Sequence, residues 1–200
     1  MKHLPRVLIY ARLAIGILIL FFSFLHIDNY SVIATVLFAT GLLTDIFDGI
    51  IARYLKDSTQ NLRRLDSAID QIFFVMIAIA TFIQCPHFFY ENKIKLLMLA
   101  GVEALAYLIC FIKFKKEVAT HAISSKIWTL ILFATLIQIM TTCTSGILFQ
   151  ICFYVGVITR LEIIAILFIL RQWTNDVPSL YHAVLVRRGK PISRHKLFNG

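Results

Sequence analysis

Two short segments decide the fold: residues 45–53 read DIFDGIIAR, and residues 66–70, after twelve further residues, read DSAID. Each segment carries a pair of aspartates. Asp45 and Asp48 are three residues apart, and Asp66 and Asp70 are four residues apart. Because residues three or four apart share one face of a helix, each segment is predicted to present two carboxylates on one helix face.

Long apolar segments surround these aspartates. Hydrophobic residues make up 59% of the 200 residues and charged residues 16%, whereas a soluble domain is about half apolar and about a quarter charged. A spanning helix needs about 20 apolar residues, and the sequence predicts six. They cover residues 8–25, 30–54, 65–84, 94–114, 127–140 with its flanks, and 147–172. The predicted fold class is therefore an all-α polytopic membrane protein with six transmembrane helices, forming one membrane domain over residues 1–200.

The first aspartate pair ends the second predicted span, and the second pair opens the third. The connection folds these spans into a hairpin, so the four carboxylates are predicted to meet. Such charges repel strongly in a low dielectric, and a cation must lie between them. Carboxylates are hard oxygen ligands that suit Mg²⁺ or Mn²⁺, and two such ions form a clamp for phosphoryl transfer. The alternative is a charged loop whose aspartates form salt bridges to Arg53, Arg63 and Arg64.

Lysine and arginine are concentrated in the predicted N-terminus, in alternate connections and in the tail. The connections at residues 27–29 and 141–146 contain neither, while Lys93 and Lys95 are a mild exception. Because basic residues favour the cytoplasmic side, both termini and a polar active site are predicted to face the cytoplasm. Residues 1–10 are predicted to be an interfacial lead-in. Residues 176–200 are predicted to be a cytoplasmic tail, either on the membrane surface or solvated. The net charge of +9 favours an anionic bilayer over nucleic acid as the partner.

The two aspartate segments resemble the signature of the CDP-alcohol phosphatidyltransferase family, D-x-x-D-G-x-x-A-R-x8-G-x3-D-x3-D. Seven of its eight fixed positions match at the right spacing, and Leu62 stands where the signature has its second glycine. Residues 4–12, with a proline and a final arginine, resemble the start of the family's first span. Residues 125–129 weakly resemble its G-K-x-K-T motif in the fifth span. Within the family, the chain resembles the phosphatidylglycerophosphate and phosphatidylinositol-phosphate synthases.

The resemblance implies an enzyme that transfers the phosphatidyl group of CDP-diacylglycerol to a small alcohol and releases CMP, using two Mg²⁺ or Mn²⁺ ions. By position in the signature, Asp45 and Asp66 would bridge both ions. Asp48 would bind the first ion and Asp70 the second. Asp70 would also be the base that takes the proton of the acceptor hydroxyl.

The same resemblance assigns the CDP portion of the donor to Gly49, Arg53 and Thr59. Gly49 has no side chain, so a phosphate can approach its backbone. Arg53 lies one turn further along and can donate two hydrogen bonds to phosphate oxygens.

The acceptor is predicted to be glycerol 3-phosphate, with inositol 1-phosphate or serine as alternatives. A phosphorylated acceptor needs a second cationic pocket. Four residues are candidates for it: Lys126, Arg160, Arg63 and Arg64. The alternative is that Arg160 pairs with an acid, Glu103 or Glu162, and that Lys126 is an interfacial anchor.

Other properties are less constrained by the sequence. The four cysteines, Cys85, Cys110, Cys143 and Cys152, lie in or beside apolar segments and are interpreted as small core- or lipid-facing residues. The resemblance implies a homodimer in a membrane, most simply the bacterial inner membrane. Two other classes of function stay open: a transporter that uses Glu103, Arg160 and Glu162, and an inactive membrane scaffold.

Overall fold

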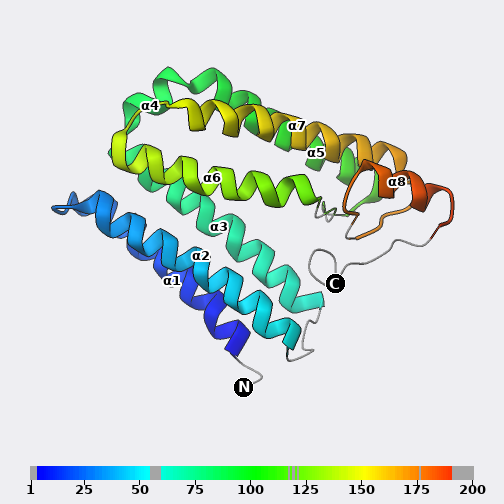
Figure 1. The fold of residues 1–200 in the computed structure, drawn as a ribbon, viewed down its shortest axis with the longest axis horizontal. Coiled ribbons are helices and arrows are strands. Elements are labelled where there is room, and N and C mark those ends of the chain that lie inside the picture. The colour runs from blue at the N-terminus through cyan, green and yellow to red at the C-terminus, as the bar shows by residue number, and fades with distance from the viewer. Residues whose placement is uncertain are drawn as a thin grey trace. The chain divides into compact units, whose positions relative to one another are not determined.

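A computed structural model describes residues 4–54, 60–116, 118, 120, 122–175 and 177–190. Within these ranges every regular element is an α-helix (Figure 1). The helices are α1 (Leu4–Leu25), α2 (Tyr30–Tyr54), α3 (Gln60–Gln84), α4 (Pro86–Glu91), α5 (Lys93–Phe114), α6 (Ile123–Thr142), α7 (Ile147–Ile169) and α8 (Leu180–Arg187). The predicted all-α fold class is confirmed.

Among the residues that the structure describes, five helices are long and apolar enough to cross a membrane: α1, α3, α5, α6 and α7. A shorter apolar stretch of the described residues, Tyr30–Asp45, lies in α2. Large apolar side chains such as Leu97 and Ile147 are 70% and 81% exposed. Exposed apolar side chains along such helices are what a lipid environment requires. The protein is therefore a polytopic membrane protein.

Some element boundaries differ from the prediction. α3 begins at Gln60, before the predicted span, because its first turns are polar and carry no hydropathy signal. No helix was predicted at the position of α4, which begins at Pro86, a residue suited to the first turn of a helix. α1 begins at Leu4, within the predicted lead-in.

The chain forms two compact units. The first unit contains Met1–Tyr90 and Leu136–Thr144, and the second contains Glu91–Thr135 and Ser145–Gly200. The helix α6 therefore contributes its first part to the second unit and its last turns to the first unit.

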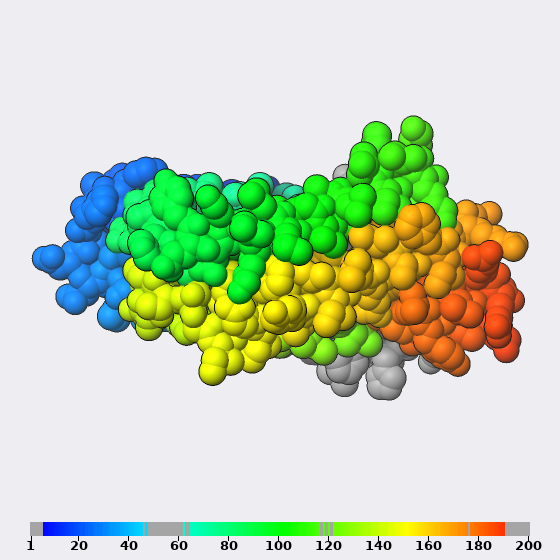
Figure 2. All heavy atoms as spheres, turned by 90° about the horizontal axis from the view of Figure 1, so that it is seen from above, coloured from blue at the N-terminus to red at the C-terminus, as the bar shows by residue number. Residues whose placement is uncertain are grey.

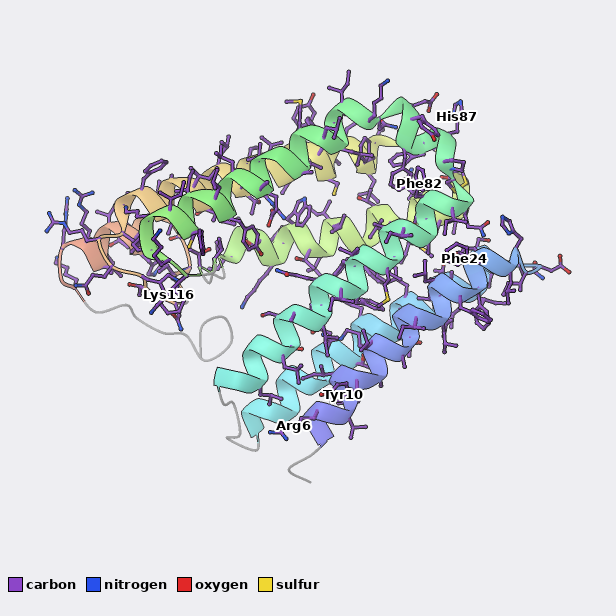
Figure 3. The ribbon with its side chains drawn as sticks, turned by 180° about the vertical axis from the view of Figure 1, so that it is seen from behind. Arg6, Tyr10, Phe24, Phe82, His87 and Lys116 are labelled. Atoms are coloured by element: carbon purple, nitrogen blue, oxygen red, sulfur yellow. A yellow bond between two sulfur atoms is a disulfide. The ribbon has the colours of Figure 1, made fainter. Side chains whose placement is uncertain are left out.

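In the first unit, α1, α2 and α3 run side by side (Figure 1). The start of α1, the end of α2 and the start of α3 lie at the same end of this bundle, where Figure 3 labels Arg6 and Tyr10. Phe38 of α2 and Phe73 of α3 are buried in its core, with ring centroids 5.7 Å apart. The predicted hairpin of the second and third spans is therefore present.

A disulfide joins Cys85, directly after α3, to Cys143, directly after α6. The interpretation of the cysteines as small core- or lipid-facing residues did not include this bond, which joins residues 58 apart in the sequence. A separation of this length does not indicate a disulfide, because the two cysteines meet only through the packing of the helices that precede them. Cys110 and Cys152 are free and buried, as predicted.

In the second unit, α5 and α7 lie side by side, with their outer side chains forming one continuous surface (Figure 2). Lys113 Nζ donates hydrogen bonds to Leu167 O and Phe168 O, at 2.8 and 3.0 Å. These carbonyls lie in the last turn of α7 and lack a partner within the helix. α8 packs on α7 through Ala183, which is fully buried, so this part of the predicted tail is not simply solvated.

Candidate metal and active site

Three aspartates from two helices meet in the first unit: Asp45 of α2, and Asp66 and Asp70 of α3. One carboxylate oxygen of each lies within 4.8 Å of the others. Their side chains are 37%, 32% and 33% exposed, so the cluster is open to ligands. The predicted convergence of the two pairs is confirmed for these three residues. Asp48 follows Asp45 by about one turn of α2, and its side chain lies outside what the structure describes.

The packing of α1 and α2 on α3 holds these carboxylates together. Gly41 lies one turn before Asp45, and Phe73 follows Asp70 by three residues. A Cβ on Gly41 would overlap Phe73 Cζ, and a Cβ on Gly16 of α1 would lie 2.9 Å from Phe73 Cδ2. The two glycines therefore let both helices close on the Phe73 ring, directly beside the aspartates.

Arg12 points into the cluster from α1, the helix of the bundle that carries none of the three aspartates. Its Nη2 lies 3.0 Å from Asp45 Oδ1, its Nη1 lies 3.2 Å from Asp66 Oδ1, and Nη1 also contacts Asp70 Oδ1. The Arg12 side chain is 1% exposed. One buried guanidinium is thus shared by three carboxylates.

This role of Arg12 was not predicted from the sequence, in which Arg12 is one of the N-terminal basic residues and part of the family resemblance. A signal was present, since Arg12 lies inside the first apolar span. An ionised side chain there is costly without a partner. The nearest acids in the predicted hairpin are the aspartates.

A second apolar cluster packs α3 on α1 on the other side of the aspartates. It contains Ile9, Leu62 and Ile69, with Leu13 and Leu65 against it. Leu62 stands at the position of the signature's second glycine, and it is 9% exposed. The leucine therefore fills space between α1 and α3 that a glycine would leave open.

The donor set fits a hard divalent cation. Oxygens bound to one Mg²⁺ lie at most about 4.2 Å apart, since each bond is about 2.1 Å long. The three carboxylates, within 4.8 Å of one another, need only small side-chain rotations to reach one ion. Two ions shared between bridging carboxylates would tolerate the wider spacing. The cluster is the one group of acids with this geometry among the described residues.

For most of the other predicted donor- and acceptor-binding residues, the structure describes the backbone but not the side chain. Gly49 and Arg53 lie in the last turns of α2, and Arg63 and Arg64 in the first turns of α3. The placement of these side chains, and Thr59 as a whole, lies outside the described residues.

The two remaining acceptor candidates belong to the second unit. Lys126 is exposed in the first turn of α6. Arg160 of α7 pairs through Nε with Glu103 Oε2 of α5, and its guanidinium stacks 3.6 Å from the ring centroid of Trp128. The alternative that Arg160 pairs with Glu103 is therefore confirmed. Glu162, the other acid proposed for Arg160, instead accepts a hydrogen bond from Ser124 Oγ at 2.6 Å.

Apolar helices of spanning length and an open acidic cluster at the end of a helix bundle define an integral membrane protein whose carboxylates could hold a metal ion. The family model for CDP-alcohol phosphatidyltransferases matches residues 2–186. The chain belongs to this family, and it is a phosphotransferase of phospholipid biosynthesis. Searches of curated proteins and of solved structures found no match.

The close approach at Gly41 gives a test of how the site is held. In Gly41→Ala the new methyl group overlaps the Phe73 ring, and overpacking of this kind costs about 1–3 kcal/mol. The melting temperature of the detergent-solubilised protein should fall. Gly101→Ala is a matched control, because nothing lies within 4 Å of a Cβ built there. Equal melting temperatures for the two variants would contradict the packing argument.

Proposed function

We propose that the protein transfers the phosphatidyl group of CDP-diacylglycerol to a small polar alcohol and releases CMP, using two divalent metal ions held by the aspartates. The observation that carries the proposal is the convergence of Asp45, Asp66 and Asp70 in a chain of this family. The donor's acyl chains would stay in the lipid around the helices. Its pyrophosphate would lie at the carboxylate end of the first unit.

The residues divide the chemical work by position in the signature. Asp45 and Asp66 would each ligate both ions, Asp48 the first and Asp70 the second. When bound, the ions would neutralise charge on the pyrophosphate and on the departing CMP. Gly49, Arg53 and Thr59 would hold the CDP portion.

Asp70 is the proposed general base. It would accept the proton of the acceptor hydroxyl as that oxygen forms a bond to the phosphorus next to the lipid glycerol. The bond from this phosphorus to the CMP oxygen breaks, and CMP leaves with the electron pair. Asp70 is one-third exposed, so an acceptor can reach its carboxylate.

For the acceptor, we propose glycerol 3-phosphate ahead of inositol 1-phosphate, with serine as the contrasting class. Four cations besides Arg53 favour a phosphorylated alcohol: Arg63, Arg64, Lys126 and Arg160. The pairing with Glu103 satisfies Arg160 only in part, since its buried Nη1 has no hydrogen-bond partner among the described residues. Glycerol 3-phosphate is placed first because it is the broadest bacterial acceptor of the family.

A transporter and an inactive scaffold are the competing classes. Neither explains why carboxylates at the spacing of the family signature converge on one point. Arg160 pairs with Glu103 and its guanidinium stacks on Trp128, so the pair links α5 and α7 without requiring a transport pathway.

Metal dependence tests the proposed mechanism. Asp45→Asn and Asp66→Asn should abolish release of CMP from CDP-diacylglycerol, since each removes a bridging ligand. EDTA should do the same to the unaltered enzyme, and Mg²⁺ or Mn²⁺ should restore activity. A thin-layer assay with labelled donor measures all of these. Full turnover in the presence of EDTA would contradict the two-metal proposal.

Acceptor recognition is tested by charge removal. Lys126→Ala should raise the KM for glycerol 3-phosphate about tenfold or more, as expected for the loss of a charged hydrogen bond, and leave donor binding nearly intact. Arg160→Ala should act in the same direction. Lys93→Ala, another exposed lysine, is the control. Efficient turnover of serine, with no response to either phosphorylated alcohol, would show that the acceptor class is wrong.

We propose an orientation in the bacterial inner membrane with both termini cytoplasmic. Disulfides persist in oxidising compartments, and Cys85–Cys143 follows the C-terminal end of α3, whereas Asp66 and Asp70 lie near its start. The helix has 25 residues and is about 37 Å long, enough to cross the bilayer. A C-terminal reporter should be active on the cytoplasmic side, and activity only on the far side would overturn this orientation.

The chain is also proposed to act as one membrane domain and as a homodimer, on the resemblance alone. A detergent-corrected mass near the monomer value of 22.9 kDa would contradict the dimer.

A further inference from the structure

Arg12 has an arrangement that the proposed reaction does not use. Its guanidinium lies at 3.0 Å from Asp45 Oδ1 and 3.2 Å from Asp66 Oδ1 and also contacts Asp70. We propose that Arg12 is a positioning residue that serves as the internal counter-ion of the aspartate cluster. It holds the three carboxylates together before metal binds, and it competes with the metal for them. This inference rests on the proposed function, because it takes the aspartates as metal ligands.

Charge explains why such a residue is needed. The three described carboxylates carry three negative charges, and in a bundle with an apolar core their repulsion would spread α2 and α3 apart. Arg12 supplies one positive charge from α1, the helix that packs against both α2 and α3. A guanidinium stays protonated at any working pH and can donate several hydrogen bonds in fixed directions. One side chain can therefore bridge three acids, which a lysine would do less well.

The same geometry makes Arg12 a competitor of the metal. In all three contacts Arg12 takes the Oδ1 atom of the aspartate. A cation that needs these oxygens must displace the guanidinium or turn the carboxylates away from it. Arg12 and the divalent ion also repel each other. Binding of metal is thus opposed by the contacts that stabilise the metal-free site.

The burial of the Arg12 side chain reduces the screening of its charge by solvent. The Arg12 side chain is 1% exposed, packed between the layer of Gly16 and Phe73 and the cluster of Ile9 and Ile69. Screening by water and salt is weak at such a position. The charge of Arg12 is therefore screened less than that of an exposed arginine, although the aspartates themselves are about one-third exposed.

The test measures Mn²⁺ binding and thermal stability of the purified full-length protein, without substrate. In Arg12→Gln, Mn²⁺ affinity measured by electron paramagnetic resonance should rise about tenfold or more, since a charged contact no longer opposes binding. The melting temperature should fall in EDTA, and saturating Mn²⁺ should recover most of the loss. Arg6→Gln, which removes an exposed arginine of the same helix, should change neither quantity.

Arg12→Lys keeps the charge and guards against a variant that does not fold. It should bind Mn²⁺ with an affinity between those of the unaltered protein and Arg12→Gln. Unchanged or weaker Mn²⁺ affinity in the Arg12 variants would overturn the inference. An equal loss of melting temperature with and without Mn²⁺ would also overturn it, because a purely structural arginine behaves in this way. If the unaltered protein binds no Mn²⁺, the proposed metal site fails first and this inference fails with it.

Discussion

The mutual repulsion of the clustered carboxylates is the constraint on which the first unit depends. Asp45, Asp66 and Asp70 are held within 4.8 Å in a bundle whose core is apolar, and this is stable only with positive charge among them. Arg12 supplies part of that charge from α1. The helix α1 is therefore part of the site, although it contributes none of the aspartates.

Helix packing converts this electrostatic requirement into a fixed geometry. Gly16 and Gly41 let α1 and α2 approach the ring of Phe73, close to the charged layer. Small residues at such crossings are the usual way for helices in membranes to pack closely, because lipid supplies little hydrophobic drive between them. On the other side of the charged layer, Leu62 and Ile9 fill the space between α3 and α1. The aspartates lie between two apolar contacts that resist changes in their spacing.

The part of this arrangement that depends on local spacing could be predicted from the sequence. Asp66 and Asp70 share a helix face wherever the helix lies, and a short connection brings Asp45 to them. The contacts that depend on tertiary approach could not be derived in this way. The pairing of Cys85 with Cys143 spans 58 residues, and the overlap at Gly41 appears only when α2 meets α3. Arg12 is intermediate, since its position in an apolar span required a partner but did not say which acid.

The two units balance the charge of a largely buried arginine differently. In the second unit Arg160 pairs with Glu103, one cation with one anion, and Trp128 covers the guanidinium. The two charges of such a pair cancel, so the pair needs no metal ion. In the first unit Arg12 contacts three carboxylates, and these four described side chains together carry an excess of two negative charges. A divalent cation would supply that charge, so the imbalance makes the aspartate cluster better suited than the Arg160 pair to hold a metal ion.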